Sequence, residues 1–403
     1  MPERRSRPGG FTRRRLLGGS AAAAGVAGLG LGAAALTRSE TGEHRPASVA
    51  TEPFYGPHQA GIATAPQDHV ALVAFDLRPG TTRDDIEGIL RIWSGDAARL
   101  TQGAPALADT EPQLTQRPAR LTVTFGFGPA VFTRAGLEHR KPAWLRPLPP
   151  FRIDKLESRW SDGDLVIQIC ADEVTTVAHA VRVLCRSVTT LTTVRWVQRG
   201  FRNATPRQTP RNLMGQVDGT ENIAAGTPDF DRLVWDDGAA QPWLTGGTSM
   251  VLRRIAMNLE TWDEIDPEGR ELSVGRKLDT GAPLTGTSEF DLPDFTAVDQ
   301  HGIPVIPQSS HIARAHHTHA GERFFRRGYN YDDAPERGQV SNSGLLFTAF
   351  QRDVDTQYLP VQQRLADFDA LNVWTTPVGS SVFVIPPGIE APGGYIGQSL
   401  FES

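Results

Sequence analysis

Cysteine is nearly absent from this chain: its 403 residues include only two, Cys170 and Cys185. Two thiols are too few for a metal centre built from thiolates, so that class of site is excluded. Cys170 ends the apolar run "LVIQIC" and Cys185 lies in "AHAVRVLC", a context typical of small buried side chains in a strand and in a helix. In an oxidising compartment, a disulfide between the two is an alternative interpretation.

An excess of charge of one sign is missing as well. The chain has 41 basic and 46 acidic residues, a formal net charge of −5, and its basic residues are scattered apart from a run at the N-terminus. This composition has none of the basic character of a nucleic-acid-binding protein. With 39% hydrophobic residues, a chain of this length is sufficient for two packed cores.

A long, strongly apolar run is the third absence. Residues 12–36 read "TRRRLLGGSAAAAGVAGLGLGAAAL", in which Arg13 and Arg14 precede a weakly hydrophobic stretch rich in glycine. This pattern predicts a twin-arginine export signal, hence the twin-arginine translocation machinery as a partner and a periplasmic, extracellular or cell-envelope location. The stretch is about long enough for a membrane anchor, but its glycines make a poor membrane helix. Cleavage near Ala33 and retention as an anchor are both open. The twin-arginine route exports folded proteins, often with a cofactor installed, so a cofactor site is expected.

Hydrophobic periodicity predicts an α+β chain after a signal and linker over residues 1–53. The first half has strands expected at 69–77, 119–128, 163–172 and 192–201, and helices expected at 81–101 and 173–188. The order strand, helix, strand, strand, helix, strand predicts a ferredoxin-like (split βαβ) domain with an antiparallel sheet over 54–214. The second half, 215–403, repeats this plan with strands at 248–259, 344–354 and 379–387, and helices at 261–275 and 355–370, the latter kinked near Pro360.

The polar segment 276–343 is far longer than a structural connection needs, which indicates either function or disorder. It contains a cluster of histidines and arginines: His311, His316, His317, His319, Arg323, Arg326 and Arg327. A zinc site is one interpretation of the later histidines, but a carboxylate or cysteine partner at a fixed spacing is missing, and a solvated polar loop is the alternative. His311 differs, because it follows "IPVIPQSS" and precedes Ile312, which indicates a position at an interior wall.

Eight motifs share an order with a known family. They are "GPHQAGI", "GDLVIQICAD", "WVQRGF", "GQVDGTEN", "GRKLDTGAPL", "SSHIARA", "RFFRRGYNY" and "WTTPVGSSVFVIPPG". Together they resemble the dye-decolourising haem peroxidases, especially the exported branch that includes deferrochelatase-like peroxidases, over about residues 54–400. The resemblance implies two ferredoxin-like domains, haem b (iron protoporphyrin IX) in a pocket of the C-terminal domain, and a homodimer.

The resemblance also implies roles for individual residues. The family signature G-x-x-D-G corresponds to Gly215–Gly219, which places Asp218 on the distal face of the haem, with His311 as the proximal iron ligand and Arg326 as the distal arginine. Arg327 is the alternative to Arg326, since the two are adjacent. Gly219, Thr220 and Glu221 match the segment along the haem edge. The hydrogen-bond partner of His311 is open among Asp353, Asp355, Asp367 and Asp369.

These residue types suit peroxide chemistry. A neutral imidazole is a strong axial ligand that leaves the opposite haem face open, a carboxylate moves the proton that O–O cleavage requires, and a guanidinium stabilises the charge on the departing oxygen. The implied function is an exported haem peroxidase that reduces hydrogen peroxide and oxidises dyes, phenols or similar reductants through a ferryl intermediate. Candidate electron relays are Trp262, Tyr329, Tyr331, Tyr358 and Trp374. One alternative is a deferrochelatase that releases iron from haem for uptake. Another is a haem carrier without turnover, but a carrier has no use for a distal acid and arginine.

Overall fold

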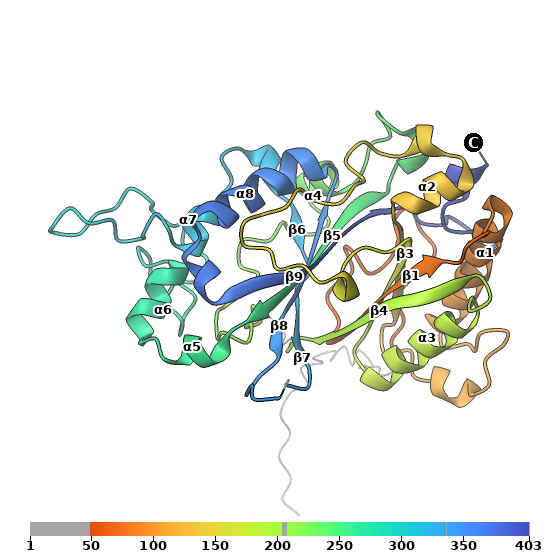
Figure 1. Cartoon of the computed structure of the whole chain (residues 1–403), viewed down its shortest axis with the longest axis horizontal. Helices are drawn as coiled ribbons and strands as arrows, with labels where there is room; N and C mark the ends of the chain where they lie inside the picture. The colour runs from red at the N-terminus through yellow and green to blue at the C-terminus, as the bar shows by residue number, and fades with distance from the viewer. Residues whose placement is uncertain (1–48, 204–207, 336, 403) are drawn as a thin grey trace, which may run out of the picture. The chain divides into compact units, whose positions relative to one another are not determined.

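The computed structural model describes residues 49–203, 208–335 and 337–402 (Figure 1). The expected export signal lies outside these residues, as does nearly all of the linker. Within the described part of the chain, no helix combines the length and the apolar character that a membrane span requires.

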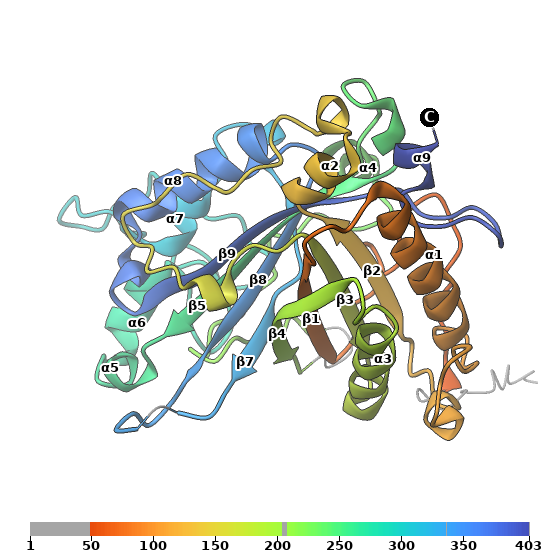
Figure 2. The ribbon, with the colours of Figure 1, turned by 45° about the vertical axis from the view of Figure 1, so that its right-hand side comes forward.

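The N-terminal half forms the ferredoxin-like unit that the sequence predicts. Its elements are β1 (His69–Leu77), α1 (Arg83–Leu100), β2 (Thr122–Phe127), β3 (Leu165–Ala171), α3 (Val174–Arg186) and β4 (Thr192–Phe201). Antiparallel pairing gives the strand order β4–β1–β3–β2, and α1 and α3 cover one face of this sheet (Figure 2).

Local chemistry explains where these elements begin. Thr82 and Asp85 form a capping box at the start of α1, so the helix begins where the threonine and aspartate of the sequence indicate. β2 begins later than expected because Ala119 and Arg120 have φ values of 47° and 56°, which no strand accommodates. A helix that the sequence analysis missed, α2 (Pro129–Ala135), begins at a proline and ends at Gly136.

The C-terminal half repeats the plan with insertions. Its elements are α4 (Pro228–Val234), β5 (Thr248–Met257), α5 (Leu259–Asp263), α6 (Pro267–Val274), α7 (His311–Ala315), β6 (Phe325–Arg326), β7 (Tyr329–Asp332), β8 (Ser343–Gln351), α8 (Leu359–Phe368), β9 (Thr375–Ile385) and α9 (Gln398–Phe401). The order is β9–β5–β8, with β6 and β7 pairing to different parts of β8. The strand positions and the ferredoxin-like order agree with the prediction.

Two helix predictions in this half need correction. The helix expected over 261–275 is two helices, because Pro267 lacks the N–H that would continue α5, and Asp266 instead caps α6. The helix expected over 355–370 opens with a π-helical turn, Val354–Tyr358, before α8, and Pro360 lies in the first turn of α8. The change from a π-helical turn to an α-helix therefore lies next to Pro360, where the sequence predicted an interruption.

The two sheets join at both edges, which the sequence did not predict. Phe127 of β2 pairs with Val384 of β9, and Phe201 of β4 pairs with Asn330 of β7. With the β5–β8 pairing, these two single pairs close the strands into a ring. Each sheet therefore covers one face of the other and keeps its other face for helices.

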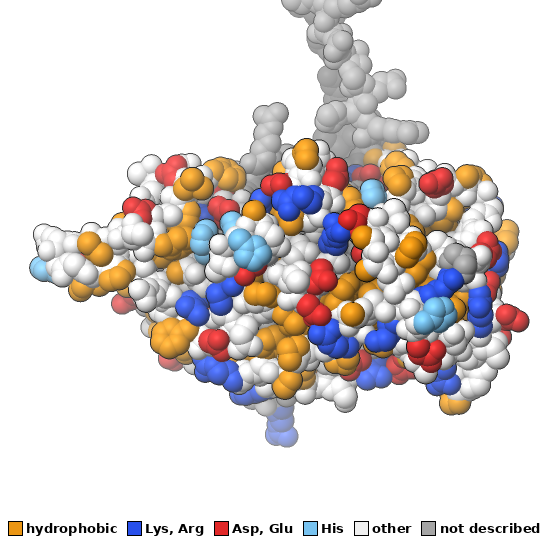
Figure 3. All heavy atoms as spheres, turned by 90° about the horizontal axis from the view of Figure 1, so that it is seen from above, with side chains coloured by type: hydrophobic (Ala, Val, Ile, Leu, Met, Phe, Trp, Pro, Cys, Tyr) orange, Lys and Arg blue, Asp and Glu red, His pale blue; other side chains and the backbone are white. Residues whose placement is uncertain are grey.

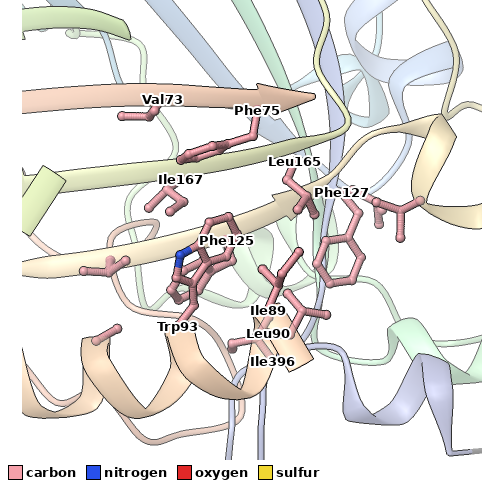
Figure 4. Close-up of a cluster of buried hydrophobic side chains, with 14 of the residues drawn as sticks. Val73, Phe75, Ile89, Leu90, Trp93, Phe125, Phe127, Leu165, Ile167 and Ile396 are labelled. Atoms are coloured by element: carbon pink, nitrogen blue, oxygen red, sulfur yellow. The ribbon is translucent and has the colours of Figure 1, made fainter. Parts of the chain in front are cut away.

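Strand β1 shows how the layers are held. Val70, Leu72 and Ala74 belong to a buried cluster that also contains β5, β8 and β9 side chains. The alternate residues, such as Val73 and Phe75, pack with Trp93 of α1 and the aromatic residues of β2 (Figure 4). Both faces of the strand are buried, which is why it reads as a continuous apolar run.

This layering decides the disulfide question. Cys170 lies in the cluster between the sheets, whereas Cys185 lies on α3 and packs on the opposite side of the N-terminal sheet. Both thiols are free. Burial raises the pKa of Cys185 to about 11, so it is a poor nucleophile as well as an unpaired one.

The surface carries charges of both signs. Figure 3 shows basic, acidic and hydrophobic side chains interspersed over one face, as the balanced composition indicates. The segment between α6 and α7 projects from the body of the protein (Figure 1).

Candidate active site

The loop that contains "GQVDGTEN" is a tight reversal that fixes the backbone of Asp218. Gly215 and Gly219 have φ values of 81° and 134°, a region that favours glycine. Asn212 accepts hydrogen bonds through Oδ1 from the backbone N–H groups of Met214 and Gln216. The N–H of Asp218 donates to the carbonyl oxygen of Pro210 at 2.9 Å. The two glycines are therefore needed for the turn that presents the carboxylate.

Asp218 faces Arg326, as the sequence analysis anticipated. Nη1 of Arg326 donates to Oδ1 of Asp218 at 3.1 Å, and the side chains are 31% (Asp218) and 27% (Arg326) exposed. The pair is thus held together but remains accessible to a small molecule.

Asn222, which the sequence analysis did not assign, ties the loop to β6. Its Oδ1 accepts from the N–H of Arg326 at 2.8 Å, and its Nδ2 donates to the carbonyl oxygen of Arg326 at 2.7 Å. The Asn222 side chain thus binds the backbone of Arg326 on one edge of β6, as a neighbouring strand would. On the other edge, Arg326 pairs with Ala349 of β8. Its place four residues after Asp218 was the only available signal.

Arg327 points elsewhere. It is fully buried, and its Nη1 donates to the carbonyl oxygen of Thr64 at 2.6 Å while Nη2 donates to Gln67. Adjacent strand residues face opposite sides of a sheet, so only one of the two arginines contacts Asp218. Arg327 instead joins β6 to the N-terminal segment.

We expect Arg327→Leu to lower the free energy of unfolding by about 1–3 kcal/mol for each buried acceptor that it leaves unpaired. Denaturant unfolding of the variant tests this. The spectrum and the peroxide reactivity of the protein that stays folded should be unchanged, and a selective loss of reactivity without a loss of stability would contradict the structural role.

His311 begins α7 and is oriented by a carboxylate. Its Nδ1 lies 2.6 Å from Oδ2 of Asp369, whose side chain is only 5% exposed, while the imidazole is 36% exposed. Oδ1 of Asp369 accepts from the N–H of Leu371, and the N–H of Ala370 donates to the carbonyl of Ser309. The structure thus selects Asp369 among the four aspartates considered.

The other three aspartates are engaged elsewhere. Asp353 caps the π-helical turn, Asp355 pairs with Arg146, and Asp367 accepts from Gln363. Among the described residues, Nε2 of His311 makes no hydrogen bond, so this nitrogen is available to a metal.

Electrostatics place the three site residues within reach of one another. Burial lowers the pKa of His311, but the carboxylate of Asp369 outweighs burial and raises the pKa above its ordinary value. The charges of Asp218 and Arg326 also act on the pKa of His311, in opposite directions. The charges of both members of the distal pair therefore act on the imidazole.

A second carboxylate holds α7 against α8. Glu322 accepts from Nη2 of Arg364 at 2.9 Å and from the N–H of Thr318 at 2.8 Å, and the same guanidinium donates to the carbonyl of His316. Burial raises the pKa of Glu322, but these hydrogen bonds outweigh burial and lower it to about 2. The segment that carries His311 is thus fastened by a charge.

The lowered pKa of Glu322 predicts that the folded protein loses stability in acid. Because the pKa of Glu322 is lower in the folded chain, its stabilisation is present above the ordinary pKa of 4.5 and is lost as pH falls toward 2. The full loss is about 3 kcal/mol of unfolding free energy. Between pH 6 and 2, the unfolding free energy of Glu322→Gln should fall by about that amount less than that of the native protein. Denaturant unfolding at several pH values measures this, and the same pH dependence in both proteins would contradict the assignment.

Thr220 and Glu221, which belong to the expected haem-edge segment, contact charged residues. Oγ1 of Thr220 donates to Glu289 at 2.8 Å, and Glu221 lies 3.7 Å from Nη2 of Arg276. Arg276 is buried and also donates to the carbonyl of Glu289. Arg276 belongs to the motif "GRKLDTGAPL", but the sequence analysis gave it no role and did not single out Glu289.

An apolar wall stands beside Arg326. Arg326 pairs with Ala349, so the side chains of Phe347 and Leu345, at alternate positions of β8, lie on the same face of the sheet. Both are partly exposed, whereas Leu346 and Thr348 between them are buried. A flat apolar surface next to a charged pair suits a macrocycle.

The remaining histidines do not form a metal site with neighbouring carboxylates or cysteines. Within the described residues, no three side chains of these types converge as metal ligands. His316 and His317 contact each other at 4.8 Å between ring centroids, and Nδ1 of His319 accepts from the N–H of Gly321. The zinc interpretation therefore has no support.

Comparison with known proteins identifies the family. The model of the Dyp-type peroxidase N-terminal domain matches residues 59–202, and that of the C-terminal domain matches residues 209–390. This chain belongs to the Dyp-type peroxidase family. The resemblance inferred from the eight motifs is thereby confirmed, and the protein is an oxidoreductase.

Relatives extend over nearly the whole chain. A dye-decolorizing peroxidase of Thermobifida fusca is 38% identical and covers 98% of both chains. A deferrochelatase of Escherichia coli is 34% identical and covers 97% of both. A crystal structure of a DyP-type peroxidase from Cellulomonas bogoriensis is 54% identical, with a TM-score of 0.87 over 89% of this chain and 100% of its own.

Haem fits the residues of this Dyp-type peroxidase. His311 offers an imidazole nitrogen without a partner, Phe347 and Leu345 offer an apolar face, and Arg276 is a buried cation within electrostatic reach of Arg326. These three features match the iron, the ring and the propionate carboxylates of haem.

Proposed function

We propose that this Dyp-type peroxidase binds haem b through His311 and uses Asp218 and Arg326 to reduce hydrogen peroxide, with dyes, phenols or similar molecules as reductants. The observation that carries the proposal is the combination of two charged pairs. His311 is oriented by Asp369 and leaves Nε2 open, and Asp218 is paired with Arg326 within electrostatic reach of that imidazole.

Each residue has a separate task. When bound, haem supplies the iron that takes up the oxidising equivalents of the peroxide. Asp218 takes the proton from one peroxide oxygen and returns it to the other, which leaves as water. Arg326 stabilises the negative charge that grows on the departing oxygen, because a guanidinium stays protonated. Asp369 holds the Nδ1 proton of His311, so that Nε2 keeps its lone pair for the iron.

Electrons from bulky reductants need a route through the protein, and the five aromatic candidates differ in their surroundings. Tyr329, Tyr331 and Tyr358 are buried. Trp262 is buried too, but it contacts the partly exposed Trp374 at 5.1 Å between ring centroids. Nε1 of Trp262 donates to the carbonyl of Met214, which adjoins Gly215. This pair is the candidate that links the surface to the Asp218 loop.

The test is a reconstitution with haem. The holoprotein should show a Soret band, react with peroxide, and oxidise a dye with kcat/KM of at least about 10⁴ M⁻¹s⁻¹. A haem-loaded protein that reacts with peroxide no faster than free haem would refute the proposal.

The deferrochelatase relatives support a second candidate, release of iron from haem. This activity predicts that holoprotein without peroxide yields free porphyrin, measured by its fluorescence. The Asp218–Arg326 pair favours the peroxidase, because removal of iron needs no group that cleaves an O–O bond.

Asn222 offers a test of how Arg326 is positioned. We expect Asn222→Leu to lower kcat/KM for peroxide about tenfold, because both hydrogen bonds to the Arg326 backbone are lost. Stability should fall by about 1–3 kcal/mol. Asn222→Asp keeps the acceptor for the Arg326 N–H, so it should be less harmful than Leu in stopped-flow measurements with peroxide. Equal rates in all three proteins would contradict this role.

Export and assembly complete the proposal. The twin-arginine pattern of residues 12–36 supports export with haem installed, to the periplasm, the envelope or the medium. The family resemblance supports a homodimer. Fractionation of cells and light scattering of the purified holoprotein test the two points.

A further inference from the structure

A small polar cleft adjoins the Asp218–Arg326 pair. Its volume is about 180 Å³. The lining residues are Pro66, Arg202, Thr209, Pro210, Arg211, Asn212, Asp218, Gly219, Asn222, Arg326, Gly328, Asn330 and Leu345. The cleft lies where Phe201 and Asn330 join the two sheets, so both halves of the chain contribute to it.

Its three arginines are in different situations. Arg211 is engaged elsewhere, because it donates to the carbonyl oxygens of Gly215, Leu278 and Asp279. Arg326 uses Nη1 for Asp218 and keeps its other donors. With three arginines against one aspartate, the cleft has a formal charge of +2.

Arg202 lacks a hydrogen-bond partner for its side chain within the described residues. Its guanidinium makes neither a hydrogen bond nor an ion pair there, its Nε is shielded from solvent, and its Cζ lies 6.0 Å from the centroid of the Tyr329 ring. Burial lowers the pKa of Arg202 and outweighs the opposite effects of Tyr329, Asp68 and Asp218. Buried donors without partners are rare in folded proteins, so this one requires an explanation.

An acceptor without a partner lies in the same cleft. Nδ2 of Asn330 donates to the carbonyl of Arg211 at 3.3 Å, which directs its Oδ1 away from that carbonyl. Oδ1 is shielded from solvent and accepts no hydrogen bond from any described residue. The cleft therefore offers guanidinium donors together with one neutral acceptor. A small oxyanion that still carries a proton complements this set, because guanidinium binds its oxygens and the amide accepts its O–H.

We propose that this cleft is a binding site for a small oxyanion, with hydrogen phosphate as its first candidate, held by Arg202 and Arg326 and donating its O–H to Oδ1 of Asn330. The anion competes with Asp218 for Arg326, and in this way it slows the peroxide step. The binding stands on the cleft alone, whereas the effect on peroxide rests on the proposed function.

Calorimetry with the holoprotein tests the binding without any turnover. Sodium phosphate is titrated in HEPES buffer, with the ionic strength held constant by the buffer salt. We expect saturable binding, at least tenfold weaker in Arg202→Gln and less weakened in Arg202→Lys. Arg199→Gln is the matched control, because it removes the same charge from an exposed position three residues earlier on β4. Absence of saturable binding, or equal affinities in Arg202→Gln and Arg199→Gln, would overturn the site.

Two further titrations fix the ligand chemistry. Sulfate carries no proton at neutral pH, so it should bind several-fold more weakly than phosphate, and Asn330→Leu should remove that difference. Equal affinities for the two anions in the native protein would overturn the role of Asn330. Formate is titrated into the native protein and into Arg202→Gln in the same way. If Arg202→Gln weakens formate binding as it weakens phosphate binding, the site also takes carboxylates; if it does not, the site is specific for phosphate.

The effect on the reaction is measured separately. Stopped-flow absorbance should show that phosphate lowers the rate constant for peroxide in the native protein and in Arg199→Gln, with half-effect at the calorimetric Kd, but not in Arg202→Gln. Binding without this effect would overturn the competition for Arg326. A native protein without any peroxide reaction would refute the proposed function and leave the calorimetric result to stand.

Discussion

Replacing Asp218 by Asn should lower the rate constant for the reaction with peroxide by about 10²–10³-fold, the usual contribution of a positioned proton-transfer group. The asparagine keeps a carbonyl oxygen for Nη1 of Arg326, which Asp218 now binds at 3.1 Å. It loses the ability to take and return a proton. The loss should therefore appear in the peroxide step rather than in haem binding, and single-turnover stopped-flow absorbance measures it.

The control separates chemistry from folding. Haem content and unfolding free energy of Asp218→Asn should stay near those of the native protein, as should those of Asp84→Asn, an exposed carboxylate at the start of α1. An unchanged single-turnover rate would rule out a catalytic role for Asp218. A variant that merely loses its haem would indicate a structural aspartate instead.

Removing the imidazole of His311 should have the largest effect of any single change. Loss of an outer-shell partner of a metal ligand typically costs 10–100-fold in affinity or activity, so loss of the ligand should cost at least about 100-fold in peroxide turnover. We expect His311→Ala to shift the Soret band and to release haem readily. Asp369→Asn, which weakens only the bond to Nδ1, should be intermediate.

Added imidazole should restore part of the Soret spectrum of His311→Ala, because it supplies the missing nitrogen. His316→Ala is the matched control, since His316 is exposed and follows α7 directly. If His311→Ala kept the native spectrum and turnover, another residue would have to hold the iron.

Sequence periodicity sufficed for most of the fold, because β1, β2 and β3 are buried on two faces and each helix carries a local cap or an amphipathic face. It failed where the boundary depends on one backbone angle or one missing N–H, as at Ala119 and Pro267. The joining of the two sheets rests on two isolated residue pairs, and no local pattern encodes them.

The candidate site, like the fold, could be predicted from the sequence only in part. The residues of the family motifs, Asp218, His311 and Arg326, could be located from the sequence, and the structure pairs Arg326 with Asp218. The motif favoured Arg326 over Arg327, but only the register of β6 on β8 shows which face each arginine takes. Asn222 binds the backbone of Arg326 and Glu289 binds the hydroxyl of Thr220, and such partners become visible only when the chain is folded.

The two residue pairs that close the ring of strands, Phe127–Val384 and Phe201–Asn330, join segments that are synthesised at different times. The edges of β2 and β4 are complete once residue 201 has emerged, yet β9, which pairs with β2, ends at residue 385. At about 5–20 residues per second, the intervening 184 residues take about 10 to 40 s to make. The β4 edge stays unpaired until β7 has been made and the β2 edge until β9 has been made, and open edges are where chains aggregate. The ring of strands can therefore close only after the last strand of the chain has been synthesised.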